Sequence, residues 1–416
     1  MTSPSPNQRP AMHTTLPNGL TVIAELHASM KSVAVGFFVR AGARDESDAV
    51  WGVSHFLEHM AFKGRGELDG DELNRRFDQI GAHYNASTSE EVTTYYAAVL
   101  PEYLDEATTL LATLLQPDLR DDDFETEKQV IIEEIGMYDD SPGFLAYEKL
   151  MATHFENHPL GRSILGTPES IRELPRDAMA EYHGRRYGAS AVTMVVTGQA
   201  KWDQVLALAE SHCGDWKPGA ADRELPPPSL GRRTHITHRP DMLIQTVAQG
   251  ADAPAAQSPL RLPAELLAIV VGDDSGSRLY WDLVDTGAAE TAELSFNEYD
   301  GCGVWMTFLA GLPDRIPDLL SRVAAIYDAV NADGVTADEL QRAQNKLSSR
   351  LVLQGERPMG RLGAVGSNWT SRGELVSLDE ELAAIAAVTT DDIRRLLDGF
   401  PLGQVTTATV GPLESV

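Results

Sequence analysis

Residues 55–59 read His-Phe-Leu-Glu-His, and this pentapeptide is the most informative stretch of the chain. If the segment is helical, His55 and His59 lie four residues apart on one face, so both imidazoles can reach one metal ion. Glu58 lies beside the same site, where its carboxylate could take a proton from water at the metal. The order is inverted from the His-Glu-x-x-His arrangement of zinc proteases.

The residues around this motif are apolar. Between Trp51 and Phe62, the two histidines and the glutamate are the only ionisable residues. Burying three such side chains costs free energy unless a partner satisfies them, and a metal ion would be such a partner. The alternative is a pair of core histidines bonded to each other or to the backbone, with Glu58 exposed.

A catalytic zinc usually has three protein ligands and one open position, so a third ligand is required. Residues 124–135, FETEKQVIIEEI, have helical spacing. Glu127 and Glu134 are two helical turns apart and therefore face one direction, whereas Glu133 points about 100° away and is expected to be solvated. Taken alone, the stretch fits an acidic amphipathic helix equally well.

Together the two stretches resemble the pitrilysin/insulinase family of inverted-motif zinc metallopeptidases. The similarity is greatest to its short-chain branch, which includes mitochondrial processing peptidase and its bacterial relatives. The family pattern is His-x-x-Glu-His, then roughly 75 residues, then Glu. Here 74 residues, 60 through 133, separate His59 from Glu134. Residues 52–64, GVSHFLEHMAFKG, and 130–142, VIIEEIGMYDDSP, are also close to the family's wording.

Position by position, the resemblance implies that His55, His59 and Glu134 bind Zn²⁺ and that Glu58 is the general base. Glu127 would join the catalytic set by orienting a ligand or steadying the site. The implied reaction is peptide hydrolysis, in which zinc lowers the pKa of a water molecule and Glu58 removes its proton. Glu58 then passes that proton to the leaving amine.

Residues 81–89, GAHYNASTS, resemble the family's edge strand, where substrate is held as an added strand. Backbone hydrogen bonds from Asn85, Ala86 and Ser87 would hold an extended peptide with little regard for its side chains. Without the resemblance, an ordinary sheet edge beside a turn explains the stretch as well. The family also implies a closed chamber between two halves, so unfolded peptides are the expected substrates.

Length and an internal repeat predict two domains. At 416 residues the chain exceeds one ordinary core. The Pro-rich stretch 217–233 predicts a linker between a zinc-binding domain, 1–216, and a similar domain without the metal motif, 234–416. Residues 170–198 have a faint counterpart in 382–411. We therefore expect a duplicated α+β fold, each domain a mostly antiparallel sheet with helices packed on it.

The second half departs from the family at two positions. There the family often contributes an Arg and a Tyr that bind substrate and stabilise charge on the attacked carbonyl. Residues 277–279 keep the opening Ser-Arg-Leu, but counting without gaps places Gly287 and Thr291 at the two positions. In one interpretation, a homologous partner chain supplies the Arg and the Tyr in a heterodimer, or otherwise the chain forms a homodimer. In the other, activity is weak or lost and the chain is structural. The complete ligand set and base favour the heterodimer.

Charge and composition argue against a nucleic-acid-binding, secreted or membrane-spanning protein. The net charge is −28 at pH 7, from 34 basic and 62 acidic residues, which disfavours nucleic-acid binding. Acid-lined cavities attract cationic peptides, although the charge also fits simple solubility. Residues 1–8 are polar and no apolar run reaches eighteen residues, so we expect neither a signal peptide nor a membrane span. Cys213 and Cys302 suit free thiols in a reducing, cytoplasmic compartment.

Two other sets of residues receive no catalytic role. Residues 274–277, DSGS, lack the Gly-x-Ser-x-Gly elbow of a serine hydrolase. Four histidines outside the motif need no ligand role on sequence grounds: His83, His154, His158 and His183.

Overall fold

The computed structural model describes residues 11–220, 222–226, 228 and 232–416, and these form two compact units. The first unit comprises the described residues of Met1–Ile135, Ser163–Glu224 and Val352–Leu378. The second comprises those of Gly136–Arg162, Leu225–Leu351 and Asp379–Val416.

Some sequence expectations fall outside the described residues. They are the absence of a signal peptide, which concerns residues 1–8, and the parts of the linker at 221, 227 and 229–231. The passage from the first unit to the second falls between Glu224 and Leu225, inside the stretch 217–233. Within the described ranges, no helix is both long and apolar enough to cross a bilayer.

The first unit is built on a six-stranded sheet with the order β1-β2-β8-β3-β7-β6. The parallel pair is β2 with β8, and the other neighbours are antiparallel. All residues of β3 and β8 are buried, because both faces of the central strands are covered. The strands are β1 (Met12–Thr15), β2 (Thr21–Leu26), β3 (Val33–Val39), β6 (His83–Thr88), β7 (Thr93–Val99) and β8 (Val192–Gly198).

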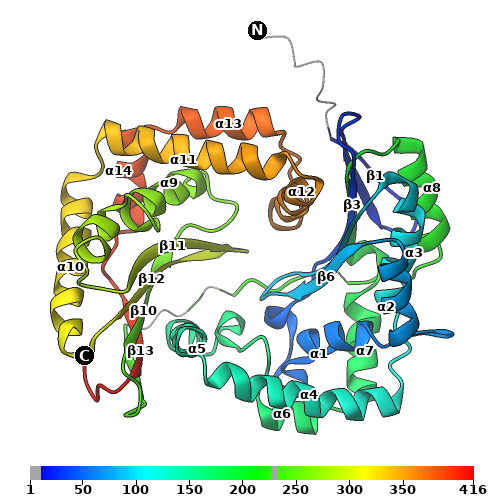
Figure 1. Ribbon diagram of the computed structural model, residues 1–416, viewed down its shortest axis with the longest axis horizontal. Coiled ribbons are helices and arrows are strands. Elements are labelled where there is room, and N and C mark those ends of the chain that lie inside the picture. Colours follow the sequence, from blue (N-terminus) through cyan, green and yellow to red (C-terminus); the bar gives the residue numbers. More distant parts are fainter. Residues whose placement is uncertain (1–10, 221, 227, 229–231) are drawn as a thin grey trace. The chain divides into compact units, whose positions relative to one another are not determined.

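Helices α3 and α12 lie on opposite sides of β3 (Figure 1). A separate two-stranded ribbon joins β4 (Gly64–Arg65) to β5 (Leu68–Asp69). The helices of this unit are α1 (Val53–Ala61), α2 (Gly70–Gln79), α3 (Leu104–Leu114), α6 (Pro168–Glu173), α7 (Arg176–Arg186), α8 (Trp202–Cys213) and α12 (Pro358–Arg372). Helix α4 (Asp121–Asp139) begins in this unit and ends in the second.

The second unit repeats the plan with a five-stranded sheet of order β11-β12-β10-β13-β9. Its parallel pair is β13 with β9. The strands are β9 (Thr234–His238), β10 (Gln245–Ala253), β11 (Thr291–Tyr299), β12 (Cys302–Gly311) and β13 (Thr406–Gly411). The helices are α5 (Pro142–Phe155), α9 (Arg261–Gly272), α10 (Ile316–Asp333), α13 (Leu378–Ala387) and α14 (Thr390–Gly399), with most of α11 (Ala337–Gly355).

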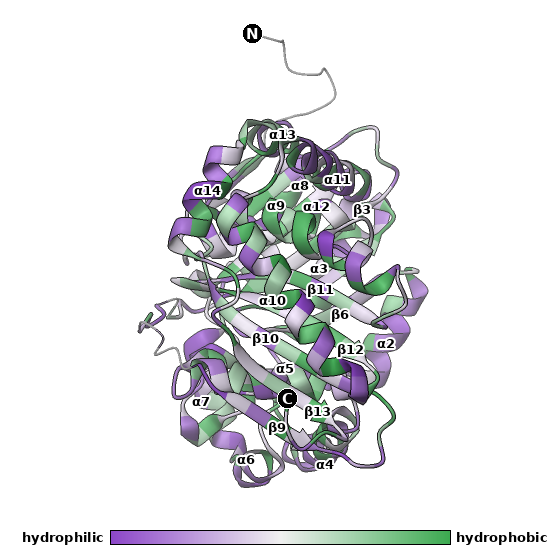
Figure 2. Cartoon of the chain, turned by 90° about the vertical axis from the view of Figure 1, so that its left-hand side faces the viewer, coloured by the Kyte–Doolittle hydropathy of each residue, from purple (hydrophilic) through white to green (hydrophobic). Residues whose placement is uncertain are grey.

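The colouring of Figure 2 separates buried from amphipathic helices in the second unit. Helix α9 is green over most of its length, and residues 266–272 are all buried. Helix α14 is mostly purple, and its buried residues are Ile393, Leu396 and Leu397, which follow helical spacing. The predicted duplicated α+β architecture, with mostly antiparallel sheets, is confirmed.

The two units exchange a helix each, which the contiguous ranges 1–216 and 234–416 did not anticipate. Helix α5 comes from the first half of the chain but packs on β10 and β13 (Figure 1). Its apolar face, including Leu150 and Phe155, joins the cluster of Ala248 and Met306. Helix α12 comes from the second half but packs on β3 and β8. Each sheet therefore gains the apolar cover that its own half of the chain does not supply.

A buried ion pair fastens α12 to the first sheet. The carboxylate of Glu25, on β2, accepts two hydrogen bonds from the guanidinium of Arg361, of 2.8 and 2.7 Å. Both side chains are buried. Close packing supports the pair, because a Cβ at Gly366 would lie 2.1 Å from the ring of Phe38. Burial raises the pKa of Glu25, but hydrogen bonds from His27 and Arg361 outweigh it and lower that pKa to about 2.

Glu25→Gln leaves the buried Arg361 without its counter-charge. We expect the free energy of unfolding to fall by about 3–5 kcal/mol, measured by chemical denaturation at pH 7. Because the pKa of Glu25 is lowered from 4.5 to about 2, its contribution is complete above about pH 4.5 and is lost as the pH falls towards 2. The variant should therefore lose stability less steeply in that acid range.

The matched control is Asp338→Asn, which breaks an exposed pair with Arg342. This control should change stability by no more than about 0.5 kcal/mol. Equal stabilities for wild type and Glu25→Gln would show that the pair does not anchor α12.

Candidate metal centre

Helix α1 carries the histidine motif, and its first turn is fixed by a carboxylate. Glu46 accepts hydrogen bonds from the backbone N–H groups of Gly52 and Ser54, both of 2.7 Å. Gly52 has φ of +89°, and a Cβ there would lie 2.8 Å from Ile171 Cδ1, so glycine is required. Backbone hydrogen bonds and close packing together fix the start of α1. The two histidines that follow on this helix are therefore held in place.

An aromatic stack joins α1 to α4, the helix that carries the distant glutamates. The rings of Phe56 and Phe124 lie 4.6 Å apart at an interplanar angle of 13°. Ile131 and Ile135 are also buried on α4. This packing turns Glu127 and Glu134 towards α1, and Glu133 is exposed.

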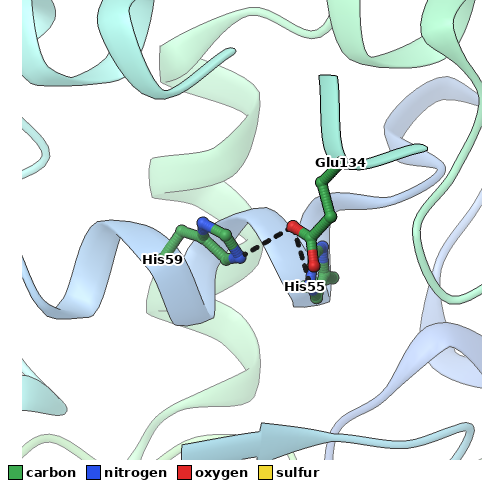
Figure 3. Close-up of side chains that lie close together, drawn as sticks. All are labelled: His55, His59 and Glu134. Atoms are coloured by element: carbon green, nitrogen blue, oxygen red, sulfur yellow. Dashed lines mark ion pairs between the residues drawn. The ribbon is translucent and has the colours of Figure 1, made fainter. Parts of the chain in front are cut away.

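The three predicted metal ligands converge (Figure 3). Glu134 Oε2 lies 3.3 Å from His59 Nε2 and 3.8 Å from His55 Nε2. One ligand atom from each of the three residues lies within 4.8 Å of the others. Two residues of one helix and one of its neighbour therefore surround a single point, in the arrangement that the family resemblance implied.

The donor set fits a metal ion. Glu134 Oε2 is buried and, among the described residues, receives no hydrogen bond although it faces two imidazole nitrogens. An acceptor in this state lacks the cation or donor that would satisfy it. Two imidazoles and one carboxylate are the ligand set of a common class of catalytic zinc sites.

Glu127 fixes the orientation of His59. Its Oε1 lies 2.9 Å from His59 Nδ1, and its other oxygen pairs with Lys63. With Nδ1 engaged, Nε2 is the nitrogen left to face Glu134. Burial lowers the pKa of His59, but the hydrogen bond to Glu127 and the nearby Glu134 carboxylate outweigh burial and raise it to about 9. Metal binding would therefore displace a proton from His59.

His55 and Glu58 are shifted chiefly by burial. The pKa of His55 is lowered by burial and by the neighbouring His59, so its imidazole is neutral. The pKa of Glu58 is raised by burial, against a hydrogen bond of 2.5 Å from Thr88 Oγ1 to Glu58 Oε2. A raised carboxylate pKa suits a group that takes a proton and returns it.

Thr88 connects Glu58 to the edge of the sheet. It is the last residue of β6, which pairs with β7 on one side and, within the described residues, with no strand on the other. Asn85, Ala86 and Ser87 lie on this strand, and the side chains of Asn85 and Ser87 are exposed. The backbone N–H of Ala86 is bonded to the Asn85 side chain.

Neither Gly287 nor Thr291, in the second unit, can replace the Arg and Tyr expected at these positions. Gly287 lies in a turn with φ of +69°, and Thr291 is the first residue of β11. Arg278, in the Ser-Arg-Leu of residues 277–279, donates hydrogen bonds to both carboxylate oxygens of Glu339 and to the carbonyl of Gly334. It therefore ties the start of α11 to the turn before it.

The model of the insulinase family, peptidase family M16, matches residues 21–168, and that of the peptidase M16 inactive domain matches residues 173–347. The chain belongs to the M16 family. An uncharacterized zinc protease of Rickettsia felis is 30% identical over 95% of this chain and 96% of its own.

Two solved structures share the fold. A protease from Helicobacter pylori aligns with a TM-score of 0.89 and 22% identity over 97% of this chain and 100% of that chain. A peptidase M16 inactive domain from Pseudomonas fluorescens aligns at 0.90 and 17% identity, over 97% and 98%. The two family models and the Rickettsia relative confirm the family resemblance drawn from the two motif stretches.

Three residues beside the M16 motif were missed by the sequence reasoning: Glu46, Lys63 and Thr88. Lys63 lies four residues after His59, and Thr88 directly follows the predicted substrate-binding residues 85–87. Proximity to the motifs was therefore a usable signal for these two. No local pattern marks Glu46, because its role depends on a turn that brings it back to the start of α1.

Glu127→Gln should weaken zinc binding by about 10- to 100-fold, because His59 loses the carboxylate that orients it. Competition with a chromophoric chelator measures this affinity directly. Glu133→Gln, on the same helix but exposed, is the matched control and should bind zinc like the wild type. Equal zinc affinities of the wild type, Glu127→Gln and Glu133→Gln would show that Glu127 does not support the metal site.

Proposed function

We propose that the chain is a zinc-dependent endopeptidase that acts on unfolded peptides. The observation that carries the proposal is the convergence of His55, His59 and Glu134 around one point, with Glu58 on the same helix turn. The M16 relatives named zinc proteases support it.

His55, His59 and Glu134 would hold the zinc ion. When bound, zinc supplies a Lewis acid that polarises a carbonyl and acidifies water. Glu58 is the general base that takes the proton from the attacking water and delivers it to the leaving amine. Thr88 orients its carboxylate through Oε2. Glu127 and Lys63 hold His59 in the orientation that keeps Nε2 towards Glu134.

The edge of β6 is the proposed substrate site. A peptide added beside Asn85, Ala86 and Ser87 would extend the first sheet by one strand. The Thr88–Glu58 hydrogen bond then sets the distance between this strand and the base. Only a segment that can become extended fits such an edge, which favours unfolded substrates.

Glu58→Gln should abolish peptide hydrolysis, by at least about 100-fold in kcat, because the amide cannot take up a proton. Zinc content is measured on the same samples, so that loss of the base is separated from loss of the metal. Glu133→Gln serves as the charge-matched control on α4. Normal turnover by Glu58→Gln with zinc bound would show that another group is the base.

The second unit bears on whether the chain works alone. Gly287 and Thr291 cannot stabilise charge on a substrate carbonyl, which would cost roughly 3–4 kcal/mol of transition-state stabilisation. We therefore propose that the chain is the metal-bearing subunit of a heterodimer whose homologous partner supplies an Arg and a Tyr. The alternative is a weakly active or structural subunit, and the same two residues support it.

Mixing the pure chain with a homologous partner that carries the Arg and Tyr should raise peptide hydrolysis by about 100-fold or more. A partner in which that Arg and Tyr are replaced is the control. If the lone chain is as active as the mixture, the heterodimer proposal is wrong. If no mixture turns over although zinc is bound, the structural role is supported instead.

The cysteines support a reducing compartment, which we propose to be the cytoplasm. Within the described residues neither Cys213 nor Cys302 forms a disulfide, and Cys213 is buried. Burial raises the pKa of Cys213 to about 12, so this thiol is unreactive.

A further inference from the structure

The second unit contains a small cavity that the proposed peptidase activity does not use. It has a volume of about 180 Å³, and its lining includes residues from the end of α5, from β10 and from the connection between α14 and β13. His154, Asp252, Arg232 and Thr406 are among its lining residues. All four belong to the second unit, whereas His55, His59 and Glu134 belong to the first.

His154 is an unusual residue in this place. It is 2% exposed, and its Nδ1 lies 3.2 Å from Thr406 Oγ1. Its Nε2 is buried and has no hydrogen-bond partner among the described residues. Asp252 Oδ1 lies 3.8 Å from Nε2, too far for a hydrogen bond. A buried ring nitrogen without a partner costs free energy unless something in the cavity bonds to it.

The charge state of this histidine limits what that partner is. Burial lowers the pKa of His154 to about 4, so the imidazole is neutral at pH 7. If Nδ1–H donates to Thr406, Nε2 presents a lone pair to the cavity. Nε2 and the Asp252 carboxylate are then two acceptors 3.8 Å apart, and a donor nitrogen about 2.9 Å from each satisfies both.

A cationic group lines the same cavity. The guanidinium of Arg232 donates to the side-chain oxygen of Gln404 and keeps other N–H groups available. Burial raises the pKa of Asp252, and Arg232 partly offsets this by its charge. The cavity thus offers one negative group, one positive group and one neutral acceptor.

We propose that this cavity binds a small zwitterion, namely a free α-amino acid with a small side chain. The ammonium group lies between Asp252 and His154 Nε2, and the carboxylate pairs with Arg232. The volume favours a ligand smaller than those of drug-sized sites, which occupy roughly 300–1,000 Å³.

Singly charged ligands fit less well. A bare metal cation would find two protein ligands, His154 and Asp252, and would be repelled by Arg232. A simple anion would pair with Arg232 but be repelled by Asp252. The proposal does not depend on peptide hydrolysis, so the zinc centre and this site can be tested separately.

Isothermal titration of the full-length chain with glycine and L-alanine tests the proposal. Both should bind, whereas acetate and methylamine, which each carry half of the charge pattern, should bind at least about tenfold more weakly. The titration is repeated after zinc is removed with a chelator, and the affinity should be unchanged. Loss of binding on chelation would place the amino acid at the zinc centre and overturn the proposal.

Variants of the two charged residues locate the site. Asp252→Asn and Arg232→Gln should each weaken glycine binding by about tenfold, because each removes one charge-assisted hydrogen bond. Both side chains reach solvent, so folding is expected to survive, and circular dichroism checks it. Asp314→Asn, an exposed charge change elsewhere in the unit, is the matched control.

Three results would contradict the proposal. The first is no binding of either amino acid. The second is wild-type affinity in both Asp252→Asn and Arg232→Gln. The third is binding of Zn²⁺, but of neither amino acid, in the cavity, with that Zn²⁺ binding lost in Asp252→Asn.

Discussion

The face-to-face packing of Phe56 on Phe124 is the contact on which the metal centre depends. It brings two helices together although more than sixty residues separate the two rings in the sequence. With α1 and α4 packed in this way, Glu134 Oε2 lies 3.8 Å from His55 Nε2 and 3.3 Å from His59 Nε2. An apolar contact thus stabilises an arrangement of ionisable groups that burial alone would oppose.

Around this contact, each polar group of the site is held by a second residue. Glu46 holds the start of α1, Glu127 holds His59, and Thr88 holds Glu58. These bonds reduce the number of orientations that the reacting groups can adopt, which lowers the cost of reaching a productive geometry. The polar side chains of the candidate site are therefore held in place by their neighbours in the fold.

Because the units exchange helices, each sheet is covered in part by a helix from the other half of the chain. The sheet that carries the proposed substrate edge is covered in part by α12, a helix from the far half of the chain. The Glu25–Arg361 pair therefore links the C-terminal half to the sheet whose edge strand is β6. In the second unit α5 plays the corresponding part, and it also brings His154 to the cavity beside Asp252.

The sequence by itself determined the chemistry of the site. Spacings of four residues in 55–59 and seven in 127–134 are properties of a single helix, so they fix which side chains share a face. These faces, together with the family resemblance of the two stretches, predicted the ligand set, and chain length, the Pro-rich stretch and the internal repeat predicted the duplicated α+β fold. The tertiary structure decided which segments meet: the Thr88–Glu58 bond, the exchanged helices and the cavity at His154. Such contacts join residues 30 to more than 300 positions apart, and they follow from packing of whole faces rather than from any local period.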